Sequence, residues 1–133
     1  YIQHIPYFIL GGGSNILMAD EGYGGLVIFN RAKGTSFRHT GASVVCTAES
    51  GVNLSSLTRK CINKGLGGLE WAINVPGTVG GAVFGNAGAH GADMSTNVRA
   101  VTLYKPGKER YVLSNEEMEF WWFKSQSRCF SFT

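Results

Sequence analysis

The five residues Gly11-Gly12-Gly13-Ser14-Asn15 directly follow an apolar stretch, and their types are those of a phosphate-binding loop. Glycine has no Cβ and tolerates positive φ, so such a loop turns sharply and lets a ligand approach the backbone. Successive N–H groups then form a concavity for anionic oxygen, and Ser14 and Asn15 add side-chain donors. A tight turn without a ligand accounts for the loop equally well, because a glycine loop alone is a weak signal.

A second glycine-rich segment, from Val75 to Gly91, has small residues at most of its positions. Such a composition favours neither helix nor strand, so contacts rather than local propensity must order it. Two interpretations stay open: a flat ligand gripped by backbone, or two backbone segments packed closely together. No Lys or Arg lies between Gly65 and Val98. An anion bound by this segment would therefore be held by N–H, hydroxyl and amide donors.

Three better-known loop motifs do not fit these glycines. A dinucleotide-binding GxGxxG started at Gly11 has Ile16 at its sixth position. A Walker A loop requires Ser or Thr after Gly-Lys, whereas Glu109 follows Gly107-Lys108. A GxSxG nucleophile elbow fails because Ile16 stands where its last glycine is required.

Composition and charge argue against several other function classes. The net charge is only +3 and the basic residues are scattered, whereas a nucleic-acid surface needs a clustered basic stripe. Cys46, Cys61 and Cys129 form no CxxC pair, so reduced thiols of a cytosolic protein are expected. The three histidines lie far apart without zinc-site spacing. Apolar runs are broken by glycine or charge too soon for a membrane span.

Short apolar runs bounded by turn residues predict strands that would position the two glycine segments. The last two of these strands form a hairpin through the turn Lys105–Lys108. The predicted strands are 5–10, 25–29, 43–47, 98–104 and 110–113.

One clear helix is predicted between the glycine clusters. Asn53 is its N-cap, and Leu54, Leu57 and Cys61 follow on one face at helical spacing. Gly65 is placed to end it.

Further helical structure is expected only in short pieces. Residues 69–73 suggest one helical turn, and 75–91 suggest loops around a brief helix or turn. Ser114 and Glu117 match a capping box, which predicts a short helix from Ser114. Strands mixed with a few helices indicate an α+β architecture, and no linker divides the chain.

Both glycine clusters, in this order, resemble the UDP-N-acetylenolpyruvoylglucosamine reductase (UDP-N-acetylmuramate dehydrogenase) family. The matching text is LGGGSNIL at Leu10–Leu17, GLVI at Gly25–Ile28, GGLEW at Gly67–Trp71 and VPGTVGGAVFGNAGAHG at Val75–Gly91. The long glycine run is specific to this family, whereas the first loop also belongs to a wider superfamily of FAD-binding oxidoreductases. The resemblance extends from about Ile5 to about Phe120.

The resemblance implies an α+β, two-lobed FAD-binding domain of the PCMH (vanillyl-alcohol-oxidase-like) type, incomplete at both ends. Residues 1–120 would form this domain, with one lobe at about 1–50 and the other at about 51–120. Residues 121–133 would be a divergent tail, and a C-terminal substrate domain would be absent.

The same resemblance implies FAD as cofactor and NADPH as reductant. The family reduces the enolpyruvyl group of a small-molecule UDP-sugar to give UDP-N-acetylmuramate, a cytoplasmic step of peptidoglycan precursor synthesis. No nucleic-acid or membrane partner is implied. The residues assigned to FAD are Gly11, Gly12, Gly13, Ser14, Asn15, Val75, Pro76, Gly77, Thr78, Gly80, Gly81, Asn86, Gly88, Ala89 and Gly91.

The chain departs from the family at its catalytic residues. Aligning Phe120 with the Phe that precedes the family's Tyr-Arg-x-Ser motif puts Phe123 where the Arg belongs and Lys124 beside it. Phe cannot stabilise a developing enolate, and Lys lacks the planar fork of Arg. The family's serine proton donor and catalytic glutamate lie in the substrate domain.

We therefore assign no catalytic residue and expect this stretch to be inactive alone. Two alternatives remain. The chain could belong to another PCMH-type FAD oxidoreductase, or it could be a non-catalytic domain whose glycines serve packing.

Overall fold

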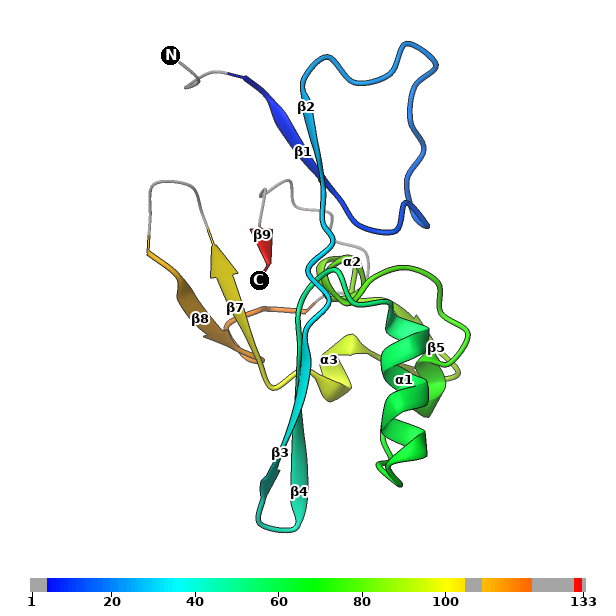
Figure 1. Ribbon diagram of the computed structural model, residues 1–133, viewed down its shortest axis with the longest axis vertical. Coiled ribbons are helices and arrows are strands. Elements are labelled where there is room, and N and C mark those ends of the chain that lie inside the picture. Colours follow the sequence, from blue (N-terminus) through cyan, green and yellow to red (C-terminus); the bar gives the residue numbers. More distant parts are fainter. Residues whose placement is uncertain (1–4, 105–108, 121–130, 133) are drawn as a thin grey trace.

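The computed structural model describes residues 5–104, 109–120 and 131–132. Figure 1 shows two strands and a long loop at one end, short helices at the centre, and a narrow hairpin at the opposite end. No helix in these ranges is long and apolar enough to cross a membrane.

The strands β1 (Tyr7–Leu10) and β2 (Leu26–Phe29) pair in parallel, with Tyr7 opposite Leu26 and Leu10 opposite Phe29. Both predicted strands are confirmed. The loop between them begins with the first glycine cluster and leaves the end of β1 toward the helices (Figure 1). The parallel pair therefore presents Gly11 to Ser14 at its carboxyl end.

An antiparallel hairpin, β3 (Thr35–Thr40) and β4 (Ser43–Ala48), follows. The sequence predicted β4 but missed β3, because β3 carries only one apolar side chain, Phe37. Phe37 and Cys46 pack against a buried cluster that includes Leu57 of the next helix. The hairpin is thus anchored by its inward face rather than by a long apolar run.

The helix α1 (Leu54–Asn63) confirms the predicted helix and its boundaries. The side chain of Asn53 accepts a hydrogen bond from the Ser56 N–H at 2.9 Å, which is the predicted N-cap. Gly65 has φ +69°, the left-handed conformation in which helices commonly end. The buried face carries Leu54, Leu57, Thr58 and Cys61.

Short elements follow α1 and complete the core. They are the 3-10 turn η1 (Glu70–Ala72), α2 (Val79–Phe84), β5 (Gly88–Ala89), β6 (Ala92–Asp93) and α3 (Met94–Asn97). The second glycine segment therefore contains a brief helix, as expected. Its apolar residues join α1 and η1 in one buried cluster of Leu54, Trp71, Ala72, Ala82, Val83 and Met94.

A last sheet contains the predicted hairpin β7 (Ala100–Tyr104) and β8 (Tyr111–Ser114), with β9 (Ser131–Phe132) on the other side of β7. The turn expected at residues 105–108 lies outside the described residues. So do Phe123 and Lys124, the residues aligned with the family's catalytic motif.

The predicted helix from Ser114 is wrong. Its capping-box bonds do form: Glu117 accepts from the Ser114 N–H at 2.8 Å, and the Glu117 N–H donates to Ser114 Oγ at 3.3 Å. The segment nevertheless makes only a turn, and Glu119 has φ +46°. A helix must bury an apolar face to outweigh its costly nucleation, and only Met118 and Phe120 of this segment contact the core.

The cysteines Cys46 and Cys61 contact each other between β4 and α1, and both are free thiols. Cys61 is buried and Cys46 partly buried. Burial, and then the neighbouring Cys61 thiol, raises the pKa of Cys46 to about 11. Burial likewise raises the pKa of Cys61. Both are therefore protonated at neutral pH, and Cys129 lies outside the described residues.

Candidate functional site

The two glycine segments meet at Gly12 and Gly77. A Cβ placed on Gly12 would lie 3.2 Å from the Gly77 Cα and 3.4 Å from Ser14 Oγ. A Cβ placed on the neighbouring Gly11 would collide with Thr78 Oγ1. Cβ atoms rarely lie this close to other atoms in proteins. The lack of side chains on Gly11 and Gly12 therefore allows the two glycine segments to lie against each other.

Unpaired backbone donors gather at this junction. The N–H groups of Gly12, Gly13 and Ser14 have no hydrogen-bond partner within the described ranges, nor do those of Gly77 and Thr78. The Ser14 hydroxyl is also without a partner there. Successive free N–H groups favour binding of anionic oxygen, and Gly13, at φ +71°, has no atom within 4 Å of an added Cβ.

The start of α1 holds the second segment in place. The Leu54 N–H donates to the Gly77 carbonyl at 3.1 Å, and Asn53 Nδ2 donates to the same oxygen at 3.3 Å. Ser55 Oγ donates to the Val75 carbonyl at 2.9 Å. These bonds occupy the carbonyl oxygens of Val75 and Gly77, while the N–H groups of Gly77 and Thr78 stay unpaired within the described residues.

Two cavities adjoin the junction and share Gly12, Asn53 and Thr78. The larger, of about 490 Å³, is lined by Gly12, Ser14, Asn53, Ser55, Arg59, Ile73, Asn74, Pro76, Gly77 and Thr78. The smaller, of about 300 Å³, is lined by Gly11, Gly12, Phe29, Asn30, Arg31, Lys33, Gly51, Asn53 and Thr78. Volumes in this range are typical of small-molecule sites.

The cleft contains positively charged side chains that the sequence did not lead us to expect. We expected anion binding without cations because none lies between Gly65 and Val98. The fold brings Arg59 to the larger cavity and Arg31 and Lys33 to the smaller one, and neither lining includes an acidic residue. The cleft is therefore electropositive through residues supplied by α1 and by the segment after β2.

Six of the residues assigned to cofactor binding line these cavities: Gly11, Gly12, Ser14, Pro76, Gly77 and Thr78. Gly13 adjoins them in the same loop. Two other glycines of the segment have structural roles, because Gly80 packs against Ser50 and the Gly81 N–H donates to Thr78 Oγ1 at 3.4 Å. Asn15 and Val75 are not among the lining residues.

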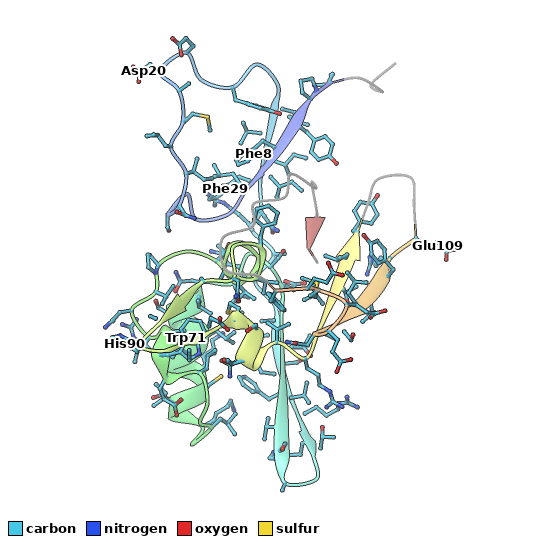
Figure 2. All side chains as sticks on the ribbon, turned by 180° about the vertical axis from the view of Figure 1, so that it is seen from behind. Phe8, Asp20, Phe29, Trp71, His90 and Glu109 are labelled. Carbon is cyan, nitrogen blue, oxygen red and sulfur yellow. The ribbon has the colours of Figure 1, made fainter. Side chains whose placement is uncertain are left out.

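The segment Asn86–Gly91 lies away from both cavities as they stand in this structure. Asn86 donates to Asp93 Oδ2 at 3.2 Å and accepts from the Ser95 N–H at 3.0 Å, so its amide is engaged internally. A Cβ on Gly88 would lie 2.9 Å from the Ala92 carbonyl, which is a packing role. Figure 2 shows His90 and Trp71 in the half of the molecule away from Phe8 and Phe29.

Ten residues that line the cavities were missed as site residues in the sequence: Phe29, Asn30, Arg31, Lys33, Gly51, Asn53, Ser55, Arg59, Ile73 and Asn74. A signal for two of them was present, since Ser55 and Arg59 stand at i and i+4 on the predicted helix and so share one face. Arg31 and Lys33 directly follow a predicted strand. The local sequence contains no signal that shows which of these polar residues would lie beside the glycine loop.

The loop that holds Asn86 depends on the ionised Asp93. Hydrogen bonding from the Ser95 hydroxyl, with smaller contributions from Asn86 and the Thr96 and Ser95 N–H groups, lowers the Asp93 pKa despite partial burial. A lowered folded-state pKa stabilises the fold above the unfolded value of about 3.9. That stability is lost as the pH falls through the folded-state pKa.

We expect Asp93→Asn to flatten the acid limb of the stability curve. Urea unfolding of both proteins between about pH 2 and pH 6 should show a shallower decline for the variant below about pH 4. Glu117, whose pKa is lowered by Ser114, titrates in the same window, so Glu117→Gln is the matched comparison. If the free energy of unfolding fell equally steeply with pH for wild type and Asp93→Asn, the stabilising role of ionised Asp93 would be contradicted.

Comparison with known proteins relates this chain to an FAD-binding family. Residues 1–112 match the family described as FAD binding domain. Among solved structures, the chain superposes on UDP-N-acetylenolpyruvylglucosamine reductase from Thermus caldophilus with a TM-score of 0.72 and 31% identity, over 91% of this chain and 43% of that one.

Curated sequences give the same association. The chain is 42% identical over 116 residues to the UDP-N-acetylenolpyruvoylglucosamine reductase of Chlamydia muridarum, which is 87% of this chain and 38% of the relative. It is 42% identical over 123 residues to that of Clostridioides difficile, 92% of this chain and 40% of the relative. The chain thus spans about two fifths of the length of these relatives.

Proposed function

The chain belongs to the FAD binding domain family, and from this we propose that it is the flavin-binding part of a UDP-N-acetylenolpyruvoylglucosamine reductase. The observation that carries the proposal is the contact of Gly12 with Gly77, where unpaired N–H groups from two distant segments line one cleft. Similarity to reductases of that name, over most of this chain, supports the choice of substrate.

The residues of the cleft fit the cofactor. Free N–H groups at Gly12, Gly13 and Gly77 suit a diphosphate, and the cleft bears positive charge. A Cβ at Gly12 would occupy the space between the two loops. We assign the diphosphate to this junction, with the remaining portions of the dinucleotide in the two cavities that adjoin it.

In the proposed reaction, bound FAD supplies hydride-transfer chemistry between NADPH and the enolpyruvyl double bond of the UDP-sugar. The contribution of the described residues is to hold and orient the cofactor. The rest of the relatives' length would supply substrate binding and proton transfer, so this stretch alone is proposed to bind flavin without turnover. We retain the cytoplasmic location expected for its reduced thiols.

The two-lobed PCMH-type arrangement is part of this proposal, with lobes at about 1–50 and 51–120. The seam between them would be the junction of Gly12 with Gly77. The hairpin β3–β4 belongs to the first lobe by sequence, yet Phe37 packs beside Leu57 of α1. We therefore assign this hairpin the role of joining the lobes, and residues 121–133 that of a divergent tail.

The direct test is a titration of FAD into the purified 133-residue chain, followed by flavin fluorescence anisotropy. We expect a saturable rise in anisotropy and yellow colour that survives desalting. Riboflavin, which lacks the diphosphate, should bind more weakly because the junction donors have no anion to hold. A chain with native circular dichroism that shows no saturable FAD binding would refute the proposal.

A further inference from the structure

Among the residues that the structure describes, Arg59 is the only charged one that lines the larger cavity. It stands one helical turn after Ser55, so the two side chains share the face of α1 that borders the second glycine segment. The guanidinium has no ion pair or hydrogen bond to any residue that the structure describes. It is also exposed, which means that a solvent-borne ligand can reach it.

Three neighbouring basic side chains have other partners. Lys60, the next residue of α1, donates to Thr35 Oγ1 at 3.2 Å and so faces β3. Lys64 lies over the Phe37 ring at 5.1 Å. Arg31, in the smaller cavity, lies over the Phe29 ring at 4.9 Å. Lys33, which lines the smaller cavity, also has no partner among the described residues, but its ammonium lacks the planar fork of a guanidinium. Arg59 is thus the one unpaired guanidinium among the described cations that line the two cavities.

We propose that Arg59 binds a phosphate group of the dinucleotide and makes the cleft selective for phosphorylated flavin. This rests on the proposed function and deepens it. The planar fork of Arg presents paired donors that match phosphate oxygens, and charge-assisted hydrogen bonds are about twice as strong as neutral ones. The junction N–H groups fix the position of the anion, and Arg59 adds the charge that the second glycine segment lacks.

The test compares Arg59→Gln with Lys60→Gln in the 133-residue chain. Both variants lose one positive charge from adjacent positions of the same helix, but only Arg59 faces the cavity. For Arg59→Gln we expect about tenfold weaker FAD binding at low salt, the loss of one charge-assisted bond. Its affinity should also depend less on ionic strength, because an exposed charge pair is screened by salt. Riboflavin binding should be unchanged.

A conservative variant separates charge from geometry. Arg59→Lys should keep the salt dependence of FAD binding but recover only part of the affinity, because an ammonium cannot bind two oxygens in one plane. Melting temperatures of all three variants should match wild type, since Arg59 and Lys60 are exposed.

The outcomes separate this inference from the proposed function. If wild type binds FAD and Arg59→Gln binds it with the same affinity and salt dependence, the role of Arg59 is refuted and the flavin site stands. Equal weakening by Arg59→Gln and Lys60→Gln would show a general charge effect, which also refutes it. If folded wild type binds no FAD, the proposed function fails and this inference fails with it.

Discussion

Gly12→Val is expected to weaken FAD binding by up to about 100-fold while the chain stays folded. A Cβ at this position would lie 3.2 Å from the Gly77 Cα, and the two methyl groups of valine extend further into the same space. Overpacking of this kind costs roughly 1–3 kcal/mol, and at about 1.4 kcal/mol per factor of ten the upper end lowers affinity about 100-fold. Flavin anisotropy measures the binding, and circular dichroism reports the fold.

The fold should survive because Gly12 is exposed and its loop contributes to no buried cluster. Two other glycines provide the controls. Gly24→Val, in the same interstrand loop, meets no atom within 4 Å of its Cβ and should bind FAD like wild type. Gly80→Val would put its Cβ 2.7 Å from Ser50 Cβ inside the core and should unfold the chain instead.

This three-way comparison decides between the two interpretations of the glycine clusters. Global unfolding of Gly12→Val, as for Gly80→Val, would mean that the junction serves packing. Retention of FAD affinity by a folded Gly12→Val would mean that the ligand lies elsewhere. The structure shows that one explanation does not cover every glycine, because Gly80 and Gly51 lie against backbone while Gly13 stands open.

The sequence predicted the elements that are stabilised by neighbouring residues in the chain, such as caps and regularly spaced apolar side chains. The helix α1 was predicted with its N-cap Asn53 and its terminating glycine Gly65, because both signals and the apolar spacing are local in the sequence. The strand β3 was missed because its burial depends on a single residue, Phe37, packing on a helix that comes later in the chain. The helix expected from Ser114 failed for the opposite reason. Its local capping contacts form, but they do not make a helix without an apolar face to bury.

The site was predictable as two segments but not as one cleft. Sequence composition identified both glycine clusters, and only the fold shows that Gly12 meets Gly77. The pairing depends on Leu54 and Asn53, which bind the Gly77 carbonyl from the start of α1. The contribution of Arg59 could not be predicted for the same reason. The second glycine segment contains no Lys or Arg, and the positive charge of the larger cavity comes from α1, an earlier element of the chain.

The cleft is tied to the core through Leu54, and Leu54→Ala is expected to cost about 2–5 kcal/mol of unfolding free energy. Leu54 is fully buried among Trp71, Ala82 and Val83, while its N–H donates to the Gly77 carbonyl. Its truncation leaves a cavity directly beneath the junction. Such a loss is a large fraction of the 5–15 kcal/mol typical of a domain.

Urea unfolding measures the change as a lower midpoint at unchanged slope. The matched control is Ile62→Ala on the same helix, which removes an aliphatic side chain that is 40% exposed and should cost roughly 1 kcal/mol or less. If both substitutions cost the same, the described core does not rest on Leu54. If Leu54→Ala is the more costly, Leu54 supports the described core. Saturating FAD should then raise the variant's midpoint, because a ligand that binds only the folded state stabilises it.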